Sequence, residues 1–99
     1  GQSVVIKDKM IMAVEAIEGT DKCIRRGCKL AKKDACVIKV AKPNQDKRFD
    51  IPAIGLRTLK TMRKYKASLI AVEAGETIIV DQEAVIKYAD KHNIVIMAV

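Results

Sequence analysis

Aromatic residues are scarce in this sequence, which has no tryptophan, one phenylalanine and two tyrosines. Proteins that bind single-stranded nucleic acid by stacking its bases depend on several aromatic side chains. Phe49, Tyr65 and Tyr88 are too few for such a platform. We therefore expect no nucleic-acid partner that is recognised through base stacking.

Histidine and cysteine are also few. His92 is the only histidine, and Cys23, Cys28 and Cys36 form no CxxC pair. A four-ligand zinc site would have to recruit carboxylates, and cysteine catalysis would depend on one distant histidine as its base. An odd number of cysteines is typical of packed thiols in a reducing compartment, so we expect a cytoplasmic protein.

Several recognisable segments are missing. No apolar run approaches the roughly 20 residues of a membrane-spanning helix, and no signal peptide is visible. Neither GxxxxGK[ST] nor GxGxxG occurs, so the common phosphate-binding loops have no direct support. The chain begins with Gly1 and lacks an initiator methionine, from which we expect it to be part of a longer protein or a chain trimmed at its start.

Basic residues are abundant: 19 lysines and arginines against 12 acidic residues give a net charge of +7. This favours an anionic partner, namely nucleic acid, a phosphorylated ligand or an acidic membrane surface. A lysine-rich solvated surface would give the same totals. Because 49% of the 99 residues are hydrophobic, we expect one domain over 1–99 with a core of its own.

Hydrophobic periodicity predicts a layered α/β domain. We expect about six strands in a mixed sheet and three helices, in the order ββαβ-loop-αββαβ. Thr20 or Asp21 is expected to cap the first helix, and Gly27 to end or bend it early. The expected strands are "SVVIK", "MIMAVEA", "ACVIKVA", "SLIAVEA", "TIIV" and "IVIMAV", and the expected helices "DKCIRRGCKLAKK", "GLRTLKTMRKYK" and "QEAVIKYADKHN".

Two loops concentrate polar side chains. "AVEAIEGTD" leads from a strand into a helix start, where free N–H groups attract phosphate, and "KVAKPNQDKRFDIP" contains two prolines that exclude a regular strand. If "ACVIKVA" runs parallel beside "MIMAVEA", both loops leave at the carboxyl edge of the sheet, where ligands bind in open α/β folds. The expected cleft is lined by Glu18, Thr20, Asp21, Lys39, Lys42, Gln45, Asp46, Arg48 and Asp50.

These residue types fit hydrolysis of a phosphoanhydride. Lys39, Lys42 and Arg48 would offset the charge that develops on phosphate, and Asp46 and Asp50 would hold a metal or orient water. Oxygen ligands favour Mg²⁺ over zinc. Glu15 and Glu18 either reinforce such a metal site or merely lie at the strand end. From the residues alone, helix capping and a charged surface loop explain the same stretches.

"AVEAIEGTD", "IRRG", "KVAKPNQDKRFDIPAIG" and "IAVEAGETIIVD" occur in this order and resemble the C-terminal domain of the two-domain, LpxI-type UDP-2,3-diacylglucosamine pyrophosphatases. The resemblance covers nearly the whole chain. It implies a Mg²⁺-aided enzyme of lipid A biosynthesis that yields UMP and 2,3-diacylglucosamine 1-phosphate, with water attacking the phosphate on the sugar side. It also implies an N-terminal domain outside this chain, with substrate bound between the domains.

The family's catalytic aspartate falls on Asp46 or Asp50, of which Asp46 is our first choice. We also expect a metal site at both aspartates with Glu18, and a peripheral position at the inner membrane. Apolar surface left by the missing half of the protein is expected to drive formation of a homodimer. We expect 1–99 alone to hydrolyse little. The competing hypotheses are a non-enzymatic basic module that binds nucleic acid or another polyanion, and a relative acting on another nucleotide-linked substrate. The expected substrate contacts are Gly19, Thr20, Asp21, Lys39, Lys42, Gln45 and Arg48.

Overall fold

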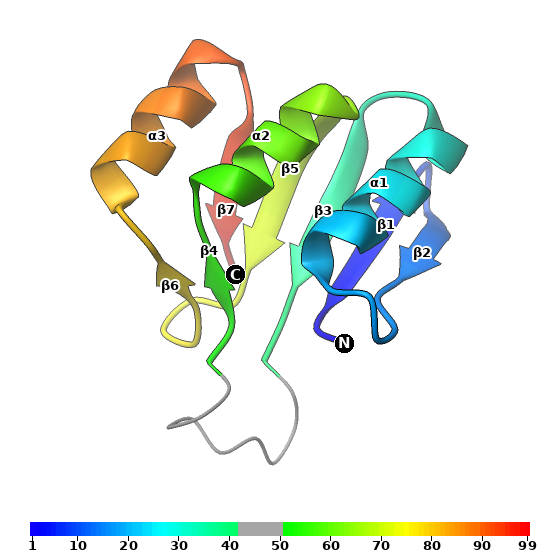
Figure 1. The fold of residues 1–99 in the computed structure, drawn as a ribbon, viewed down its shortest axis with the longest axis horizontal. Helices are drawn as coiled ribbons and strands as arrows, with labels where there is room; N and C mark the ends of the chain where they lie inside the picture. The colour runs from blue at the N-terminus through cyan, green and yellow to red at the C-terminus, as the bar shows by residue number, and fades with distance from the viewer. Residues whose placement is uncertain (42–50) are drawn as a thin grey trace.

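The computed structural model describes residues 1–41 and 51–99. These residues form a two-layer α/β arrangement (Figure 1). The strands and helices follow the expected order, with one additional short strand before the second helix. The elements are β1 (Ser3–Lys7), β2 (Met10–Val14), α1 (Thr20–Ala31), β3 (Ala35–Lys39), β4 (Ala53–Ile54), α2 (Leu56–Lys64), β5 (Ala67–Val72), β6 (Ile78–Ile79), α3 (Gln82–Lys91) and β7 (Val95–Ala98).

The main sheet has five strands in the order β2-β1-β3-β5-β7. β1 is antiparallel to both β2 and β3, whereas β3, β5 and β7 are parallel. The expected parallel pairing of β3 with β2 is therefore wrong, because β1 lies between them. The two strands nevertheless run in the same direction, since each is antiparallel to β1, and their carboxyl ends reach the same edge.

β4 and β6 form a separate two-stranded parallel sheet, in which Ala53 pairs with Ile78 and Ile54 with Ile79. The sequence pattern predicts "TIIV" as a strand of the main sheet and predicts no strand at 53–54. A strand of two residues is too short to show the alternation of apolar and polar residues by which strands are recognised in a sequence. This small sheet leads directly into α2 (Figure 1).

All three helices lie over one face of the main sheet (Figure 1). The core lies between these layers, where side chains from alternate strand positions meet the apolar stripes of the helices. The helices contribute Ile24, Leu59 and Val85 to this core, and the sheet contributes Val37 and Ile70. All five side chains are fully buried. No helix within residues 1–41 and 51–99 is long and apolar enough to cross a membrane.

At Gly27, α1 lies in close contact with β1 of the main sheet. The helix continues through it to Ala31, so the expected early end is wrong. A Cβ at Gly27 would lie 2.5 Å from Val5 Cβ, well inside van der Waals contact. The glycine therefore allows a close approach of α1 to β1, which offsets its low helix propensity.

We predict that Gly27→Ala destabilises the domain by up to about 2 kcal/mol. Overpacking against Val5 costs about 1–3 kcal/mol, and the better helix propensity of alanine returns only about 1. Urea unfolding measures the difference. Lys29→Ala, at an exposed position of the same helix, is the matched control and should leave the midpoint nearly unchanged. A Gly27→Ala protein more stable than the parent would show that α1 does not pack closely on β1.

The start of α1 also differs from expectation. Gly19 is the N-cap residue, with φ of 94°, and no side chain caps the helix. This left-handed φ suits glycine, which has no Cβ to clash. Thr20 and Asp21 are instead the first two helical residues, so their side chains are available for other contacts.

Candidate functional site at the carboxyl edge of the sheet

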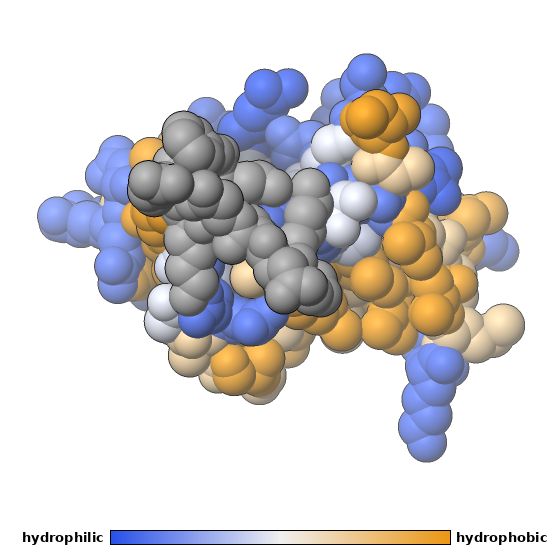
Figure 2. Space-filling model, turned by 90° about the horizontal axis from the view of Figure 1, so that it is seen from below, coloured by the Kyte–Doolittle hydropathy of each residue, from blue (hydrophilic) through white to orange (hydrophobic). Residues whose placement is uncertain are grey.

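One edge of the main sheet collects the polar groups that the sequence singled out. β2, β3, β5 and β7 end there, β1 begins there, and the N-terminus of α1 faces it (Figure 1). Figure 2 looks onto this edge from below. Topology thus brings residues 15–21, the end of β3 and the residue after β5 to one side of the molecule.

Lys39 and Thr20 form the centre of the site. Lys39 is the last residue of β3, with only 7% of its surface exposed, and its Nζ donates to Thr20 Oγ1 over 2.8 Å. The two residues come from different elements, the central strand and the first turn of α1. Because the ammonium is buried in a medium of low dielectric constant, an anion at this edge would be attracted more strongly than by a lysine in water.

The Thr20 hydroxyl makes as many hydrogen bonds as a hydroxyl can, one as donor and two as acceptor. It donates to Glu15 Oε1 over 3.1 Å and accepts from Lys39. Ser3 Oγ lies 3.3 Å away, and since a hydroxyl has one hydrogen, Ser3 must be the donor in that contact. Ser3 pairs with Lys39 across β1 and β3, which explains why both reach the same hydroxyl. This network fixes the Lys39 side chain relative to the start of α1.

Asp21 links α1 to α2. Its Oδ2 accepts from Arg57 Nε over 3.0 Å. Arg57 is 91% exposed, so this ion pair contributes little stability. Asp21 Oδ1 is buried without a hydrogen-bond partner among the described residues. An unpartnered buried oxygen beside an uncapped helix start is a polar group that a ligand or water could satisfy.

Glu18 forms an ion pair with Arg26. Its Oε1 accepts from Arg26 Nη2 over 2.8 Å and from the Ala16 N–H over 3.1 Å. These two hydrogen bonds lower the pKa of Glu18, the one from Arg26 having the larger effect. Arg26 also donates to the Val14 carbonyl. A metal at Glu18 would therefore compete with this arginine.

No three carboxylate, histidine or cysteine side chains come together as a metal site in residues 1–41 and 51–99. Five of the predicted site residues lie outside the described residues: Lys42, Gln45, Asp46, Arg48 and Asp50. The residues on either side of 42–50 are anchored at the carboxyl edge. The Ala41 N–H donates to Glu73 Oε1 over 2.9 Å, and the Pro52 carbonyl accepts from the Ile78 N–H over 2.9 Å.

Ser3 and Glu73 are the two site residues that sequence reasoning missed. Glu73 directly follows the buried end of β5, which is the signal for a polar group at a carboxyl edge. Ser3 gives no such signal, because its position opposite Lys39 follows only from the antiparallel register of β1 and β3.

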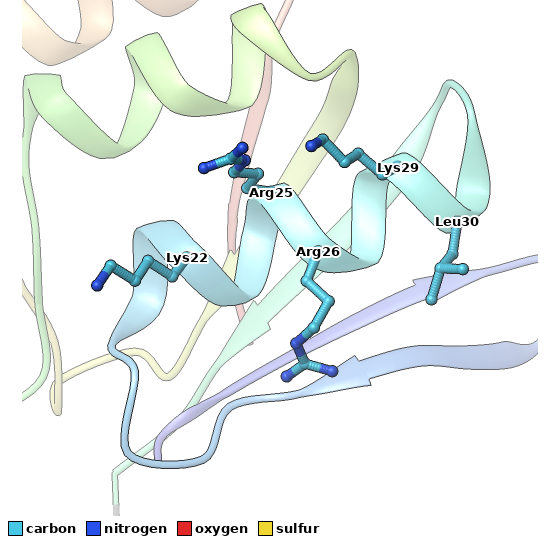
Figure 3. Close-up of a pocket in the computed structure, with 5 residues that line it drawn as sticks. All are labelled: Lys22, Arg25, Arg26, Lys29 and Leu30. Carbon is cyan, nitrogen blue, oxygen red and sulfur yellow. The ribbon is translucent and has the colours of Figure 1, made fainter.

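The outer face of α1 carries a second polar feature. An open groove of about 460 Å³ is lined by Lys22, Arg25, Arg26, Lys29 and Leu30. In Figure 3, Lys22, Arg25 and Lys29 extend from one side of the helix, while Arg26 and Leu30 point toward β1 and β2. The groove is strongly basic, because four of its five lining residues are cationic.

Comparison with known proteins agrees with the sequence resemblance. A family model described as the LpxI C-terminal domain matches residues 1–97. The UDP-2,3-diacylglucosamine pyrophosphatase LpxI of Caulobacter vibrioides is 35% identical over 107 residues. The match covers all of this chain and 38% of that relative, so the chain spans well under half the relative's length.

Proposed function

The chain belongs to the LpxI C-terminal domain family, and we propose that it forms part of an enzyme of lipid A biosynthesis. The enzyme would hydrolyse the pyrophosphate bond of UDP-2,3-diacylglucosamine to UMP and 2,3-diacylglucosamine 1-phosphate. The observation that carries this proposal is the buried Lys39, held by Thr20 at the carboxyl edge where the aspartate-containing segment 42–50 leaves and returns.

The described residues would bind and orient the pyrophosphate. Lys39 would offset negative charge on the phosphate oxygens, and the free N–H groups after Gly19 would add their dipoles. Glu15 and Ser3 act through Thr20, since their hydrogen bonds hold the hydroxyl that positions Lys39. Lys42, Gln45 and Arg48 are proposed as further phosphate contacts.

Asp46 and Asp50 are proposed as the catalytic carboxylates, with Asp46 the first choice for orienting the attacking water. A Mg²⁺ ion bound by these two oxygen-donor residues would stabilise charge on the pyrophosphate. The unpartnered Asp21 Oδ1 fits such an oxygen-rich site better than Glu18, whose Oε1 already accepts two hydrogen bonds.

A polyanion-binding module is the second candidate, and the basic groove on α1 favours it. The two functions differ in what they require of the carboxylates. A pure polyanion binder gains nothing from Asp46 and Asp50 among its cations, so their removal would strengthen its binding. Hydrolysis needs at least one of them.

We further propose that the protein acts in the cytoplasm, at the periphery of the inner membrane where its lipid substrate would reside. The three cysteines are free thiols, which supports a reducing compartment. A homodimer and an N-terminal domain that completes the cleft belong to the same proposal.

A substrate panel on the full-length protein tests the function. It would contain UDP-2,3-diacylglucosamine, UDP-glucosamine and other nucleotide-linked sugars, each with Mg²⁺ and with EDTA. We expect hydrolysis of the diacylated substrate, loss with EDTA, and little turnover by 1–99 alone. Preference for another nucleotide-linked substrate would overturn the lipid assignment. Equal rates for 1–99 and the full-length protein would contradict a cleft shared between domains.

A further inference from the structure

The face of the main sheet opposite the helices is apolar over all five strands. Strand residues that pair across a sheet point to the same side, so the register defines this face. One row across it comprises Val14, Val4, Ile38, Ala71 and Met97. The next row comprises Ile11, Ile6, Cys36, Leu69 and Val95. We call these ten residues the back face.

No residue of the back face is charged, and no helix within residues 1–41 and 51–99 covers it (Figure 1). Ile11 is 66% exposed and Val95 51%. Ala71 is buried yet lies outside the core cluster, because its neighbours on the back face shield it. Figure 2 looks along the strands from their carboxyl ends and shows hydrophobic surface along its lower margin, the side away from the helices.

The back face has about the size of the largest apolar patch on a typical single chain. Five strands spaced about 4.8 Å apart and two rows about 7 Å apart give an area of the order of 300 to 400 Å². Patches of this size on single chains are commonly interaction sites. By contrast, Val5, Val37 and Ile70 on the helix face of the same sheet are fully buried.

The parallel strands indicate what kind of cover is missing. β3, β5 and β7 form the parallel part of this mixed sheet, and sheets built wholly of parallel strands occur almost only where helices cover both faces. More than half the length of the Caulobacter vibrioides relative lies outside its match to this chain, which is ample for a second helical layer. A second copy of the chain would instead place sheet against sheet, which suits antiparallel sandwiches.

We propose that the back face is covered by amphipathic helices from the part of the full-length protein outside residues 1–99, which gives a three-layer α/β/α domain. This inference rests on one part of the proposed function, namely that residues 1–99 act within a longer protein. Ile38 and Ala71 lie at the centre of the contact, and Ile11 and Val95 at its margins.

Cys36 reports directly on this contact because it lies in the second row of the back face and is only partly buried. Cys23 and Cys28 are the internal controls, buried in the core on the helix side. Burial raises the pKa of the Cys28 thiol to about 11, so little reactive thiolate is present at neutral pH. Burial likewise raises the pKa of Cys23.

The experiment is iodoacetamide labelling of the native full-length protein, followed by mass spectrometry of each cysteine peptide. We expect Cys36 to react at least about 10-fold more slowly than in the urea-denatured protein, at every protein concentration. Ile38→Asp should expose Cys36 and leave Cys23 and Cys28 protected, which shows that the core is intact. Ile86→Asp, at an exposed isoleucine of α3, is the matched control and should change nothing.

Met97→Asp, at the margin of the back face, provides a second variant if Ile38→Asp does not fold. Fast labelling of Cys36 in the native full-length protein would overturn the proposal. Protection that appears only as protein concentration rises would also overturn it, in favour of a second copy. Labelling does not depend on turnover, so an inactive protein with protected Cys36 would refute the proposed function and leave the back-face proposal standing.

Discussion

Replacement of Asp46 by alanine in the full-length protein is expected to lower kcat for hydrolysis of UDP-2,3-diacylglucosamine by at least about 100-fold. Loss of the group that orients water, or holds the metal that does so, removes 10²-fold or more from reactions of this kind. The rate is measured as UMP released. Asp50→Ala is expected to reduce activity as well, because the second carboxylate shares the same proposed metal.

The matched control is Asp90→Ala, which removes a carboxylate from an exposed position of α3, far along the chain from the site. Its activity should equal that of the parent. If Asp46→Ala and Asp50→Ala each retain hydrolysis within a few-fold, the catalytic assignment is wrong. If both instead bind a polyanion such as heparin more tightly, the binding-module hypothesis replaces it.

Lys39→Met is expected to lower kcat/KM by about 100-fold while the protein stays folded. The ammonium is buried at the carboxyl edge, where its attraction for phosphate oxygens is strong, and loss of one such donor costs about 10²–10³. Methionine has a similar length but makes no hydrogen bond to Thr20, so some loss of stability is expected beside the loss of turnover. Urea unfolding and turnover therefore report separate effects.

Lys29→Met is the control for Lys39→Met, because Lys29 lines the exposed groove on α1. Its kcat/KM should remain near that of the parent if hydrolysis is the function. Thr20→Val tests positioning: it should lower kcat/KM less than Lys39→Met, since the ammonium remains but loses its hydrogen bond. Full activity of Lys39→Met would remove Lys39 from the site.

Much of the fold follows from local pattern. Apolar periodicity is a local property of the sequence, and it predicts the strands β1, β2 and β5 and all three helices. The order of the strands in the main sheet was not predicted, because the position of β1 between β2 and β3 depends on pairing between residues far apart in the sequence. The role of Gly27 was also missed, since only the packed structure shows that Val5 occupies the space of its missing side chain.

The candidate site was predicted in outline, as two polar loops at one carboxyl edge. Thr20 and Lys39 were both among the predicted contacts, and the structure brings them into direct contact. The contacts of Ser3 and Glu15 with the Thr20 hydroxyl could not be assigned, because this hydrogen-bond network joins residues that no sequence spacing connects. Glu18 was a predicted metal ligand, and the structure pairs it with Arg26.

The most direct test of the central claim is hydrolysis of UDP-2,3-diacylglucosamine by the full-length protein in ¹⁸O-labelled water. Mass spectrometry of both products shows which phosphorus the water attacked. We expect UMP and 2,3-diacylglucosamine 1-phosphate, with the label in the sugar phosphate and the rate lost in Lys39→Met. An intact substrate, or unchanged turnover in Lys39→Met, would contradict this claim.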